Sequence, residues 1–564
     1  MKFIVSTILS LMPVTRRRNY ILLLKFLLFL LFIVVLYSVV FHFIMLMEGR
    51  YYSWVTGVYW TLTTMSTLGF GDITFESDTG KVFSVIVLLS GIVLLLVMLP
   101  FTFIRFFYVP WLEEQASARA PRELPADTRG HVILTSFDMT IAQLVDKLRQ
   151  YGYPYVILFE DIQEALKSYD LGYRVAVGEL ADPETYRRLR ADKASLVFAS
   201  VNDMINTSIA FTARVIADKT PIVASAERDD SVDILELAGC THVFQFMKML
   251  GQSLARRTMG ASTNANVIGN VESILIAEAP VMRTPLQGKT LKETRLRETI
   301  GVTVVGIWEQ GQFILPTALT RIGPASVLLL AGSQEQLREY DSQYGQYQKS
   351  DAPVLILGGG RVGKAAAEAL RERGITYFII EKNPKVSRDR KSYIQGNAAD
   401  INTLKRAGID TAPTIIITTH DDATNIFLTI YCRRLRPDIQ IISRAEIDRN
   451  VPILHNAGAD LVMSYGSIST NTVMNLLKPN ELLMLSEGRS VVSLDVPSPL
   501  AGKSIAESQI RSHTGCSVIG VKAGDDTYLN PDPSIVLKPG NELIIICTDE
   551  SHKRFLKRYP AKKI

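Results

Sequence analysis

Two glycines, Gly69 and Gly71, flank one aromatic residue in the short stretch Thr67-Leu-Gly-Phe-Gly-Asp72. Glycine allows backbone dihedrals that other residues avoid, so successive carbonyl oxygens from Thr67 to Phe70 can point toward one axis. Oxygens arranged in this way replace the hydration shell of a permeant cation, which is the chemistry of potassium selectivity. We therefore predict a selectivity filter, with K⁺ as the permeant ion and the Thr67 hydroxyl as an innermost ligand. Its residues are Thr67, Leu68, Gly69, Phe70, Gly71 and Asp72.

The elements around this stretch would place it within a membrane. Two apolar runs, 20–47 and 82–109, are each long enough to cross a bilayer with some tilt. The interval 54–65 predicts a short pore helix that enters the membrane without room to cross it, followed by the filter up to residue 72. A plain extracellular turn is the alternative, but it leaves the half-length helix and the spaced glycines unexplained. Because one chain supplies one set of carbonyls, a closed ring requires several chains around an axis.

Basic residues predict the orientation of the chain in the membrane, and one glycine predicts where the second apolar helix could bend. The first run is preceded by Arg16, Arg17 and Arg18, and Arg105 lies near the end of the second. Basic residues stay on the cytoplasmic side, so both termini are expected in the cytoplasm of a multi-pass protein of the inner (plasma) membrane. Gly91 interrupts the second run and is a candidate gating hinge, because glycine lowers the cost of bending a helix. Close packing of helices is the alternative explanation of this glycine.

A second glycine-rich motif, Gly358-Gly-Gly360-Arg-Val-Gly363, indicates a nucleotide site. It follows a predicted strand at 354–357 and precedes a predicted helix at 363–373, and Glu381 ends the next predicted strand. In this context the glycines let a pyrophosphate approach the helix N-terminus, and the acid binds the ribose hydroxyls. We therefore expect NAD or an adenine nucleotide rather than NADP, acting as a regulatory ligand; an empty structural turn is the alternative. The predicted site is Gly358, Gly359, Gly360, Arg361, Val362, Gly363, Glu381, Lys382 and Asp400.

The corresponding stretch upstream, Thr135-Ser-Phe-Asp138, has side chains where those glycines stand. These would obstruct a phosphate, and Asp138 would repel it, so no nucleotide is expected there. Asp203 and Glu227 follow predicted strands, where gathered carboxylates could hold Ca²⁺. Solvated loop charge is the alternative for these two acids, and both explanations are kept.

The soluble part of the sequence repeats itself. Gly178-Glu-Leu-Ala-Asp182 corresponds to Gly396-Asn-Ala-Ala-Asp400, and Ala226-Glu227 corresponds to Ala445-Glu446. Alternating apolar and amphipathic segments in each repeat predict a parallel, doubly wound sheet followed by a smaller lobe. The fold class is thus an α-helical two-transmembrane pore domain followed by two α/β Rossmann-like domains in tandem, each with a small α+β C-terminal lobe. The predicted bounds are 1–110 for the pore domain, 111–128 for a linker, 129–265 and 266–340 for the first repeat, 341–350 for a second linker, and 351–480 and 481–564 for the second repeat.

Other functions lack a signal in the sequence. A formal net charge of +5 is small for 564 residues and argues against nucleic acid as a partner. The four cysteines are far apart without a CxxC spacing, which favours reduced thiols, and the scattered histidines show no zinc-site spacing. No catalytic set emerges beside the nucleotide motif, so the chain is not expected to be an enzyme.

Together, the two apolar runs, the pore helix and Thr67-Leu-Gly-Phe-Gly-Asp72 resemble a two-transmembrane prokaryotic potassium channel, whose filter usually reads Thr-Val-Gly-Tyr-Gly. Leu68 and Phe70 replace the valine and the tyrosine, and the second change removes a hydroxyl. The two repeats resemble the tandem RCK (KTN) regulatory domains of such channels, each a TrkA-N lobe and a TrkA-C lobe. The resemblance implies a K⁺-selective homotetramer in membrane lipid, with a gating ring of eight such domains that binds nucleotide and has Ca²⁺ as a further candidate ligand.

The resemblance also bears on the acids and on the function. In calcium-regulated relatives, carboxylates after the fourth and fifth strands bind the ion; Asp203 and Glu227 match two such places, whereas Ser225 stands where another acid is expected. A ligand-gated potassium channel is therefore the first function expected. A regulatory or pore subunit of a potassium uptake transporter is the alternative, but its membrane part repeats the span–loop–span unit several times, and this chain has one. A membrane-anchored nucleotide-dependent enzyme ranks third.

Overall fold

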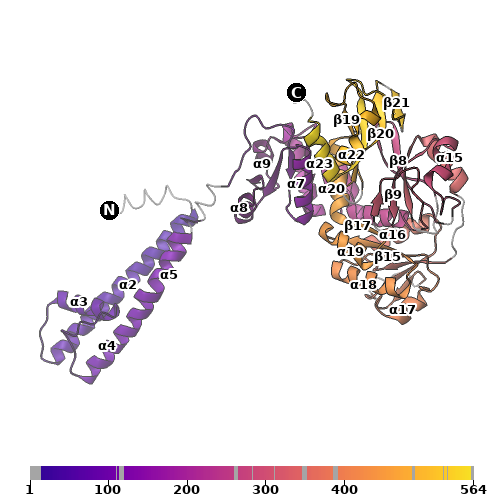
Figure 1. Cartoon of the computed structure of the whole chain (residues 1–564). Helices are drawn as coiled ribbons and strands as arrows, with labels where there is room; N and C mark the ends of the chain where they lie inside the picture. The colour runs from indigo at the N-terminus through magenta and orange to yellow at the C-terminus, as the bar shows by residue number, and fades with distance from the viewer. Residues whose placement is uncertain are drawn as a thin grey trace. The chain divides into compact units, whose positions relative to one another are not determined.

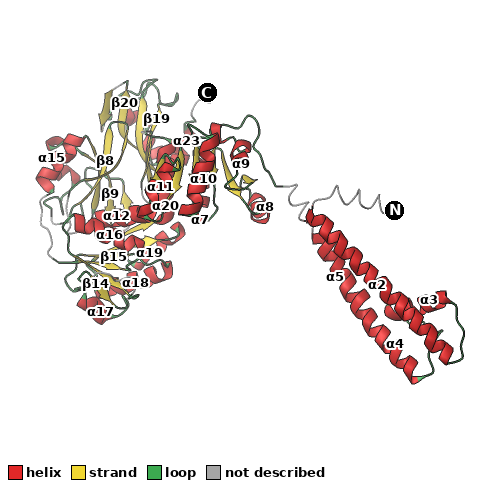
Figure 2. Ribbon diagram, turned by 180° about the vertical axis from the view of Figure 1, so that it is seen from behind, coloured by secondary structure: helices red, strands yellow, loops and turns green. Residues whose placement is uncertain are grey.

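The computed structural model of the chain describes residues 14–109, 111–112, 120–258, 264–282, 284–309, 312–324, 326–345, 352–384, 391–479, 481–485, 489–524, 526–529 and 531–560. It divides into two compact units, Met1–Pro121 with Ile162–Lys167, and Arg122–Asp161 with Ser168–Ile564. Long helices dominate the first unit (Figure 1). The second combines helices with four β-sheets (Figure 2).

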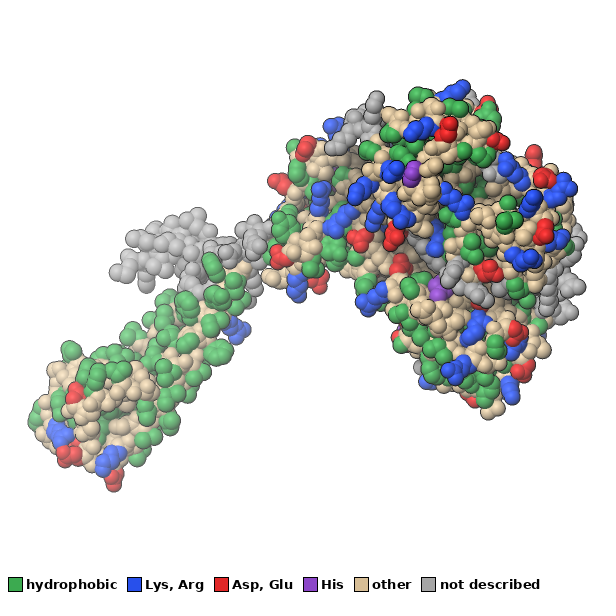
Figure 3. Space-filling model, in the orientation of Figure 1, with side chains coloured by type: hydrophobic (Ala, Val, Ile, Leu, Met, Phe, Trp, Pro, Cys, Tyr) green, Lys and Arg blue, Asp and Glu red, His purple; other side chains and the backbone are tan. Residues whose placement is uncertain are grey.

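Two long helices and a short one form the apolar part of the first unit. The first is α2 (Val14–Met47), the short one is α3 (Trp54–Met65), and the second long helix begins as α4 (Asp78–Gly91). It continues through the π-helical η1 (Ile92–Met98), through α5 (Leu99–Phe103) and through the π-helical η2 (Ile104–Tyr108). The segments Leu23–Met47 and Asp78–Phe106 are long and apolar enough to cross a membrane. Hydrophobic side chains cover much of their visible surface (Figure 3).

Capping residues set where the two later helices of this unit begin. Ser53 caps α3 by accepting a hydrogen bond from the backbone N–H of Thr56, and α3 has the bounds predicted for the pore helix. Ser77 caps α4 in the same way through the N–H of Gly80, so this helix begins at Asp78 rather than at residue 82. A side-chain oxygen at this position satisfies a backbone donor that the first helical turn leaves unpaired.

Aromatic side chains hold α3 against the two long helices. Phe41, Trp60 and Phe83 are buried together, with ring centroids 5.0 Å apart for Phe41 and Trp60 and 5.8 Å apart for Trp60 and Phe83. Gly57 lets α3 approach α2, because a Cβ there would lie 3.2 Å from the carbonyl oxygen of Ser38. This core positions the loop that follows α3.

The first repeat opens with a six-stranded parallel sheet in the order β3-β2-β1-β4-β5-β6, the order of a Rossmann fold. Its strands are short apolar runs, as expected for a parallel sheet that is covered on both faces. The strands are β1 (Val132–Leu134), β2 (Tyr155–Phe159), β3 (Val175–Val177), β4 (Leu196–Ala199), β5 (Ile222–Ser225) and β6 (His242–Phe244). The helices are α7 (Met139–Gln150), α8 (Ile162–Asp170), α9 (Pro183–Arg188), η3 (Ala191–Lys193), α10 (Asp203–Ile216), η4 (Asp229–Ser231), α11 (Val232–Leu237) and α12 (Phe246–Arg256).

The second repeat opens with an equivalent parallel sheet in the order β14-β13-β12-β15-β16-β17. The duplication and the Rossmann-like fold predicted for both repeats are therefore confirmed. The strands are β12 (Val354–Leu357), β13 (Tyr377–Glu381), β14 (Tyr393–Gln395), β15 (Thr414–Ile417), β16 (Gln440–Ala445) and β17 (Leu461–Ser464). The helices are α16 (Arg361–Glu372), α17 (Ile401–Arg406), α18 (Asp422–Leu435), η5 (Asp448–Asn450), α19 (Val451–Ala457) and α20 (Tyr465–Leu477).

Each repeat ends in a small lobe with a five-stranded antiparallel sheet, in the orders β10-β9-β11-β8-β7 and β18-β19-β22-β20-β21. Ile276 and Leu329 of the first sheet share a hydrophobic core with Ile519 and Ile544 of the second. In the first lobe lie β7 (Asn266–Val271), β8 (Ile274–Pro280), α13 (Leu291–Thr294), α14 (Leu296–Thr299), β9 (Thr303–Glu309), β10 (Gln312–Ile314), β11 (Val327–Gly332) and α15 (Gln334–Tyr344). In the second lie β18 (Leu482–Met484), β19 (Arg489–Asp495), α21 (Ile505–Ser508), α22 (Ile510–Thr514), β20 (Ser517–Ala523), β21 (Asp526–Leu529), β22 (Glu542–Thr548) and α23 (Asp549–Arg558).

The two predicted linkers differ in what the structure describes of them. The interval 341–350 begins inside helix α15, which extends to Tyr344. Ser333 caps the start of this helix in a box with Gln336, and the buried Tyr340 packs its later part against the fold. Residues 346–350 of this interval, and residues 113–119 of the interval 111–128, lie outside the described residues.

The N-terminal lobes of the two repeats pack reciprocally. Helix α12 of the first repeat lies on α16 of the second, and a Cβ added at Gly251 would overlap the carbonyl of Val362. Helix α20 of the second repeat lies on α7 of the first. The rings of Phe246 from the first repeat and Tyr465 from the second meet edge to face, with centroids 6.2 Å apart. The start of α16, which carries the glycine-rich motif, therefore lies at the contact between the repeats.

Candidate functional site

The loop after α3 has an alternating backbone. Thr67, Gly69 and Gly71 all have positive φ, at 65°, 47° and 76°. Positive φ is uncommon for a residue with a side chain, so Thr67 is held there by its surroundings. The backbone N–H groups of Leu68 and Gly69 both donate to the Thr63 carbonyl at the end of α3, at 2.9 and 3.2 Å. The alternation is what the filter prediction requires of this loop, and the K⁺ contacts themselves stay a prediction.

Side chains of α3 tether the far end of the same loop. The Tyr59 hydroxyl donates to Asp72 Oδ2 at 3.1 Å, and its ring stacks on Phe70 with centroids 6.4 Å apart. Trp60 Nε1 donates to the Ile73 carbonyl at 3.2 Å. Phe70 has no hydroxyl with which to form a hydrogen bond. The loop instead receives a hydrogen bond from Tyr59 of helix α3. Tyr59 was not predicted from the sequence, because its role depends on how α3 faces the loop.

Gly91, the predicted hinge, is the last residue of α4, directly before the π-helical segment η1. Its own dihedrals are helical, at φ −62° and ψ −45°. A Cβ at this position would overlap the backbone of Met65, at the end of α3. The structure therefore gives Gly91 a close helix–helix contact, and its role as a hinge stays a prediction.

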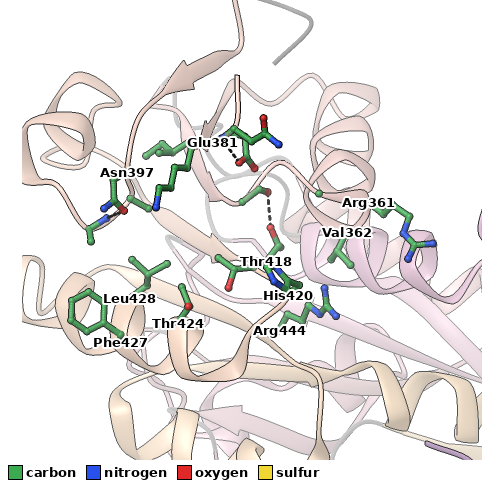
Figure 4. A pocket seen from close by; sticks show the side chains of 18 of the residues that line it. Arg361, Val362, Glu381, Asn397, Thr418, His420, Thr424, Phe427, Leu428 and Arg444 are labelled. Carbon is green, nitrogen blue, oxygen red and sulfur yellow. Dashed lines mark hydrogen bonds between the residues drawn. The ribbon is translucent and has the colours of Figure 1, made fainter. Parts of the chain in front are cut away.

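A cavity of about 1000 Å³ opens at the carboxyl ends of the strands in the second parallel sheet (Figure 4). Of the predicted nucleotide residues, its walls contain Gly358, Gly360, Arg361, Val362, Glu381 and Lys382. Gly358 has a φ of +113°, and a Cβ at Gly360 would meet no atom within 4 Å. A Cβ at Gly363 would instead overlap the Gly358 carbonyl, so this glycine packs the helix against the strand. The loop thus leaves open space in front of the N-terminus of α16, where a phosphate would bind.

Glu381 and Asp400, the two acids predicted for this site, have different roles in the structure. Glu381 lines the cavity and accepts hydrogen bonds from the backbone N–H groups of Gly359 at 2.7 Å and Asn383 at 2.8 Å. Asp400 is not among the lining residues. It caps α17 and accepts from the Thr403 hydroxyl at 2.8 Å, and this hydrogen bond is the largest cause that lowers the pKa of Asp400.

Several lining residues were missed by the sequence analysis. Most of them lie at the carboxyl ends of other strands of the sheet or on the segments that follow these strands, which is where ligands bind in open α/β sheets. They include Asn397, Thr418, His420, Phe427, Arg444 and Met247. Met247 comes from α12 of the first repeat, so the wall of the cavity is shared between repeats. Its position depends on packing and had no signal in the sequence.

The equivalent place in the first repeat is filled by side chains. Asp138 caps α7 by accepting from the backbone N–H of Ile141 at 2.8 Å. The hydroxyls of Ser136 and Ser200 lie 2.7 Å apart. The aspartate thus does for α7 what a phosphate would do for α16.

The two acids predicted for Ca²⁺ have protein partners. Asp203 accepts from the backbone N–H groups of Glu227 at 2.8 Å and Arg228 at 3.2 Å. The Glu227 carboxylate pairs with Arg361 Nη1 of the second repeat at 3.0 Å. Within the described residues, no three His, Cys, Asp or Glu side chains gather in a way that could hold a metal ion.

Comparison with protein families divides the chain in the same way. The model of the Ion channel family matches residues 28–108. The TrkA-N domain matches residues 138–246 and 354–465, and the TrkA-C domain matches residues 276–345 and 490–558.

Individual relatives agree with these matches. Probable potassium channel protein 2 of Methanocaldococcus jannaschii is 32% identical over 231 residues, which are 37% of this chain and 67% of the relative. Trk system potassium uptake protein TrkA homolog 2 of Methanosarcina mazei is 22% identical over 417 residues, which are 69% of this chain and 91% of the relative. Among solved structures, the GsuK channel bound to NAD is 36% identical, covers 96% of this chain and 99% of its own, and has a TM-score of 0.58. The GsuK RCK domain is 34% identical, covers 80% of this chain and 100% of its own, and has a TM-score of 0.56.

Proposed function

This chain belongs to the two-transmembrane potassium channels that carry tandem RCK domains, and we propose that it is a ligand-gated, K⁺-selective channel of four identical subunits. The single observation that carries the K⁺ selectivity is the alternating positive φ of Thr67, Gly69 and Gly71 between a half-length helix and the second apolar helix. Such alternation turns carbonyl oxygens toward one side of the loop, where four chains would form rings. Both termini lie in the cytoplasm of this proposed plasma-membrane protein, as the basic residues at the ends of the apolar runs indicate.

Exposed apolar side chains support the assembly of several subunits. In the single chain, Leu68 and Phe70 of the filter loop are 59% and 64% exposed. On α10 and α11 of the first repeat, Met204 and Leu237 are 83% and 87% exposed. Identical subunits around one axis would cover exposed apolar side chains at both places.

The cavity beside Gly358 and Gly360 supports a nucleotide as the gating ligand. A structural relative that covers nearly this whole chain is a GsuK channel bound to NAD. The open space before α16 suits a pyrophosphate, and Glu381 at the end of β13 suits free ribose hydroxyls. We therefore propose NAD or an adenine nucleotide as the ligand, acting as a signal rather than as a substrate.

Reconstitution of the full chain into liposomes tests this function. The wild-type chain should pass K⁺ in preference to Na⁺, and NAD should change the rate of K⁺ flux. Replacing Gly71 with Ala should abolish selective flux because its φ of 76° disfavours a side chain. Gly360→Asp should keep K⁺ selectivity and lose the response to NAD, because a carboxylate would occupy the space of the phosphate. Flux that does not discriminate K⁺ from Na⁺ in the wild type, or an NAD response that survives Gly360→Asp, would contradict the proposal.

A subunit of a potassium uptake transporter is the alternative, since TrkA proteins match the tandem repeats. The match of residues 28–108 to the Ion channel family favours a channel. Recording in planar bilayers separates the two, because unitary current steps are produced by a channel and not by a transporter cycle.

A further inference from the structure

Arg444, at the end of β16, is a buried cation on the wall of the nucleotide cavity. The residue is 6% exposed, and its guanidinium pairs with Glu446, which also lines the cavity. The Nε atom of Arg444 is buried and has no hydrogen-bond partner within the described residues. A buried donor without a partner costs free energy, so this group is prepared for an acceptor that the protein itself does not supply. Figure 4 shows the Arg444 side chain beside His420, on the side of the cavity where Val362 of α16 is labelled.

A second arginine lies at the same end of the cavity. Arg361 opens α16 and also lines the cavity. Burial lowers the pKa of Arg444; the charge of Asp422 opposes this shift, and the charge of Arg361 adds to it. Two guanidinium groups that interact in this way, next to the N-terminus of a helix, favour an anion between or beside them.

The internal repeat provides a comparison for Arg444. At the corresponding strand end of the first repeat, Ala226-Glu227 corresponds to Ala445-Glu446, and Ser225 takes the position of Arg444. The first repeat therefore lacks this arginine together with the glycines. The acid is kept in both repeats, and Glu227 pairs across the contact with Arg361 instead. The arginine thus accompanies the glycine-rich loop, as expected for a residue that serves the same ligand.

From these observations we propose that Arg444 binds a phosphate group of the nucleotide and that Glu446 neutralises it while the cavity is empty. The planar guanidinium offers several N–H donors in a fixed geometry that suits phosphate oxygens. When the phosphate binds, it takes donors of Arg444, and Glu446 loses part of its pairing with this arginine. The inference rests on the proposed function, in which this cavity takes a nucleotide.

The test compares a ligand that has phosphates with one that has none, on the full chain in detergent. NAD and adenosine share a base and a ribose, and only NAD carries phosphate. Arg444→Gln should weaken NAD binding about 10- to 100-fold, the usual range for losing hydrogen bonds to a charged group, and leave adenosine binding unchanged. Glu446→Gln should tighten NAD binding, because it removes the acid that competes with the phosphate. Ser225→Ala, the matched position of the first repeat, should bind NAD as the wild type does.

The outcomes separate this inference from the function on which it rests. A wild-type chain that binds no NAD would overturn the proposed function. Wild-type NAD affinity in Arg444→Gln would overturn the role of Arg444 alone. If Arg444→Gln weakened NAD and adenosine equally, or if Glu446→Gln did not tighten NAD, the arginine would be a structural residue and the inference would be wrong.

Discussion

At the scale of single residues, the hydroxyl of Tyr59 connects the pore helix to the filter loop through Asp72, and its ring stacks on Phe70. A hydrogen bond to a carboxylate restrains the loop, and less so where solvent reaches the bond. We expect Tyr59→Phe to lower the ratio of K⁺ to Na⁺ flux by up to about tenfold, because the loop loses this restraint. Tyr37→Phe, which keeps the ring contact with Phe83, is the control in the same liposome assay. Unchanged selectivity in Tyr59→Phe would show that the loop is held by other contacts.

His552 links the stability of the second repeat to pH. It is buried on α23 with its ring 5.3 Å from that of Tyr151, and burial lowers its pKa from 6.5 to about 4, with the charge of Asp549 opposing the shift. The unfolded chain therefore takes up this proton first, and the stabilisation is complete above pH 6.5 and lost as the pH falls toward 4. The loss is about 3 kcal/mol at most. Melting temperatures of the full chain should fall over this window, and less steeply in His552→Gln than in the exposed control His513→Gln. Parallel profiles would contradict the assignment.

At the scale of elements, Gly91 marks where the second long helix touches the pore helix. A Cβ there would overlap the Met65 backbone, one residue before the loop that leads to the filter. We expect Gly91→Ala to separate α4 from α3, lowering both the melting temperature and the K⁺ selectivity, whereas Ser90→Ala should change neither strongly. Liposome flux and thermal unfolding of the same variants measure the two effects. A changed open probability with normal selectivity and stability would favour the hinge instead of the packing contact.

Local sequence signals predicted some elements well and others poorly. The bounds of α3 and β12 follow from short apolar segments between polar caps and glycines, so both were predicted as observed. Helix α4 begins earlier than predicted because Ser77 caps it at Asp78. The sequence did not indicate this start, because the first turn, from Asp78 to Lys81, is polar and unlike a membrane span. Helix α15 reaches Tyr344 although its sequence is rich in Gln and Tyr, because burial of Tyr340 stabilises it. The burial of Tyr340 depends on the rest of the fold and therefore cannot be predicted from the local sequence.

The candidate site shows the same division. The glycine-rich loop and Glu381 were predicted because each has a local reason in the chain, a tight turn before a helix and an acid after a strand. Arg444 and Met247 reach the same cavity from a distant strand end and from the other repeat, so their roles depend on topology and on the contact between repeats. Asp400 shares the local pattern of an acid near a strand, but a helix cap uses its carboxylate.

At the scale of the whole molecule, the contact between repeats joins two places that the sequence treats as separate. Arg361 belongs to the glycine-rich loop where we propose a nucleotide, and Glu227 follows the strand end where Ca²⁺ was considered. Their side chains pair at 3.0 Å across the contact. Asp203 in turn holds the backbone of the loop at Glu227 and begins α10, a helix with exposed apolar residues. A ligand that draws Arg361 away would therefore act on the first repeat through a short chain of contacts.

A double-mutant cycle on Glu227 and Arg361 tests that connection. Both side chains are more than half exposed, so the pair contributes at most about 1 kcal/mol, or about fivefold in an equilibrium constant. A small bias becomes large when four subunits respond together, since about twofold per subunit gives roughly 16-fold overall. We expect Glu227→Gln and Arg361→Gln each to shift the NAD concentration that half-changes the K⁺ flux, and the double variant to shift it by less than the two effects combined. Arg228→Gln, whose partner Asp230 lies in the same loop, controls for lost surface charge. If the two single effects simply multiplied in the double variant, the pair would not transmit the signal, and another contact between the repeats would have to do so.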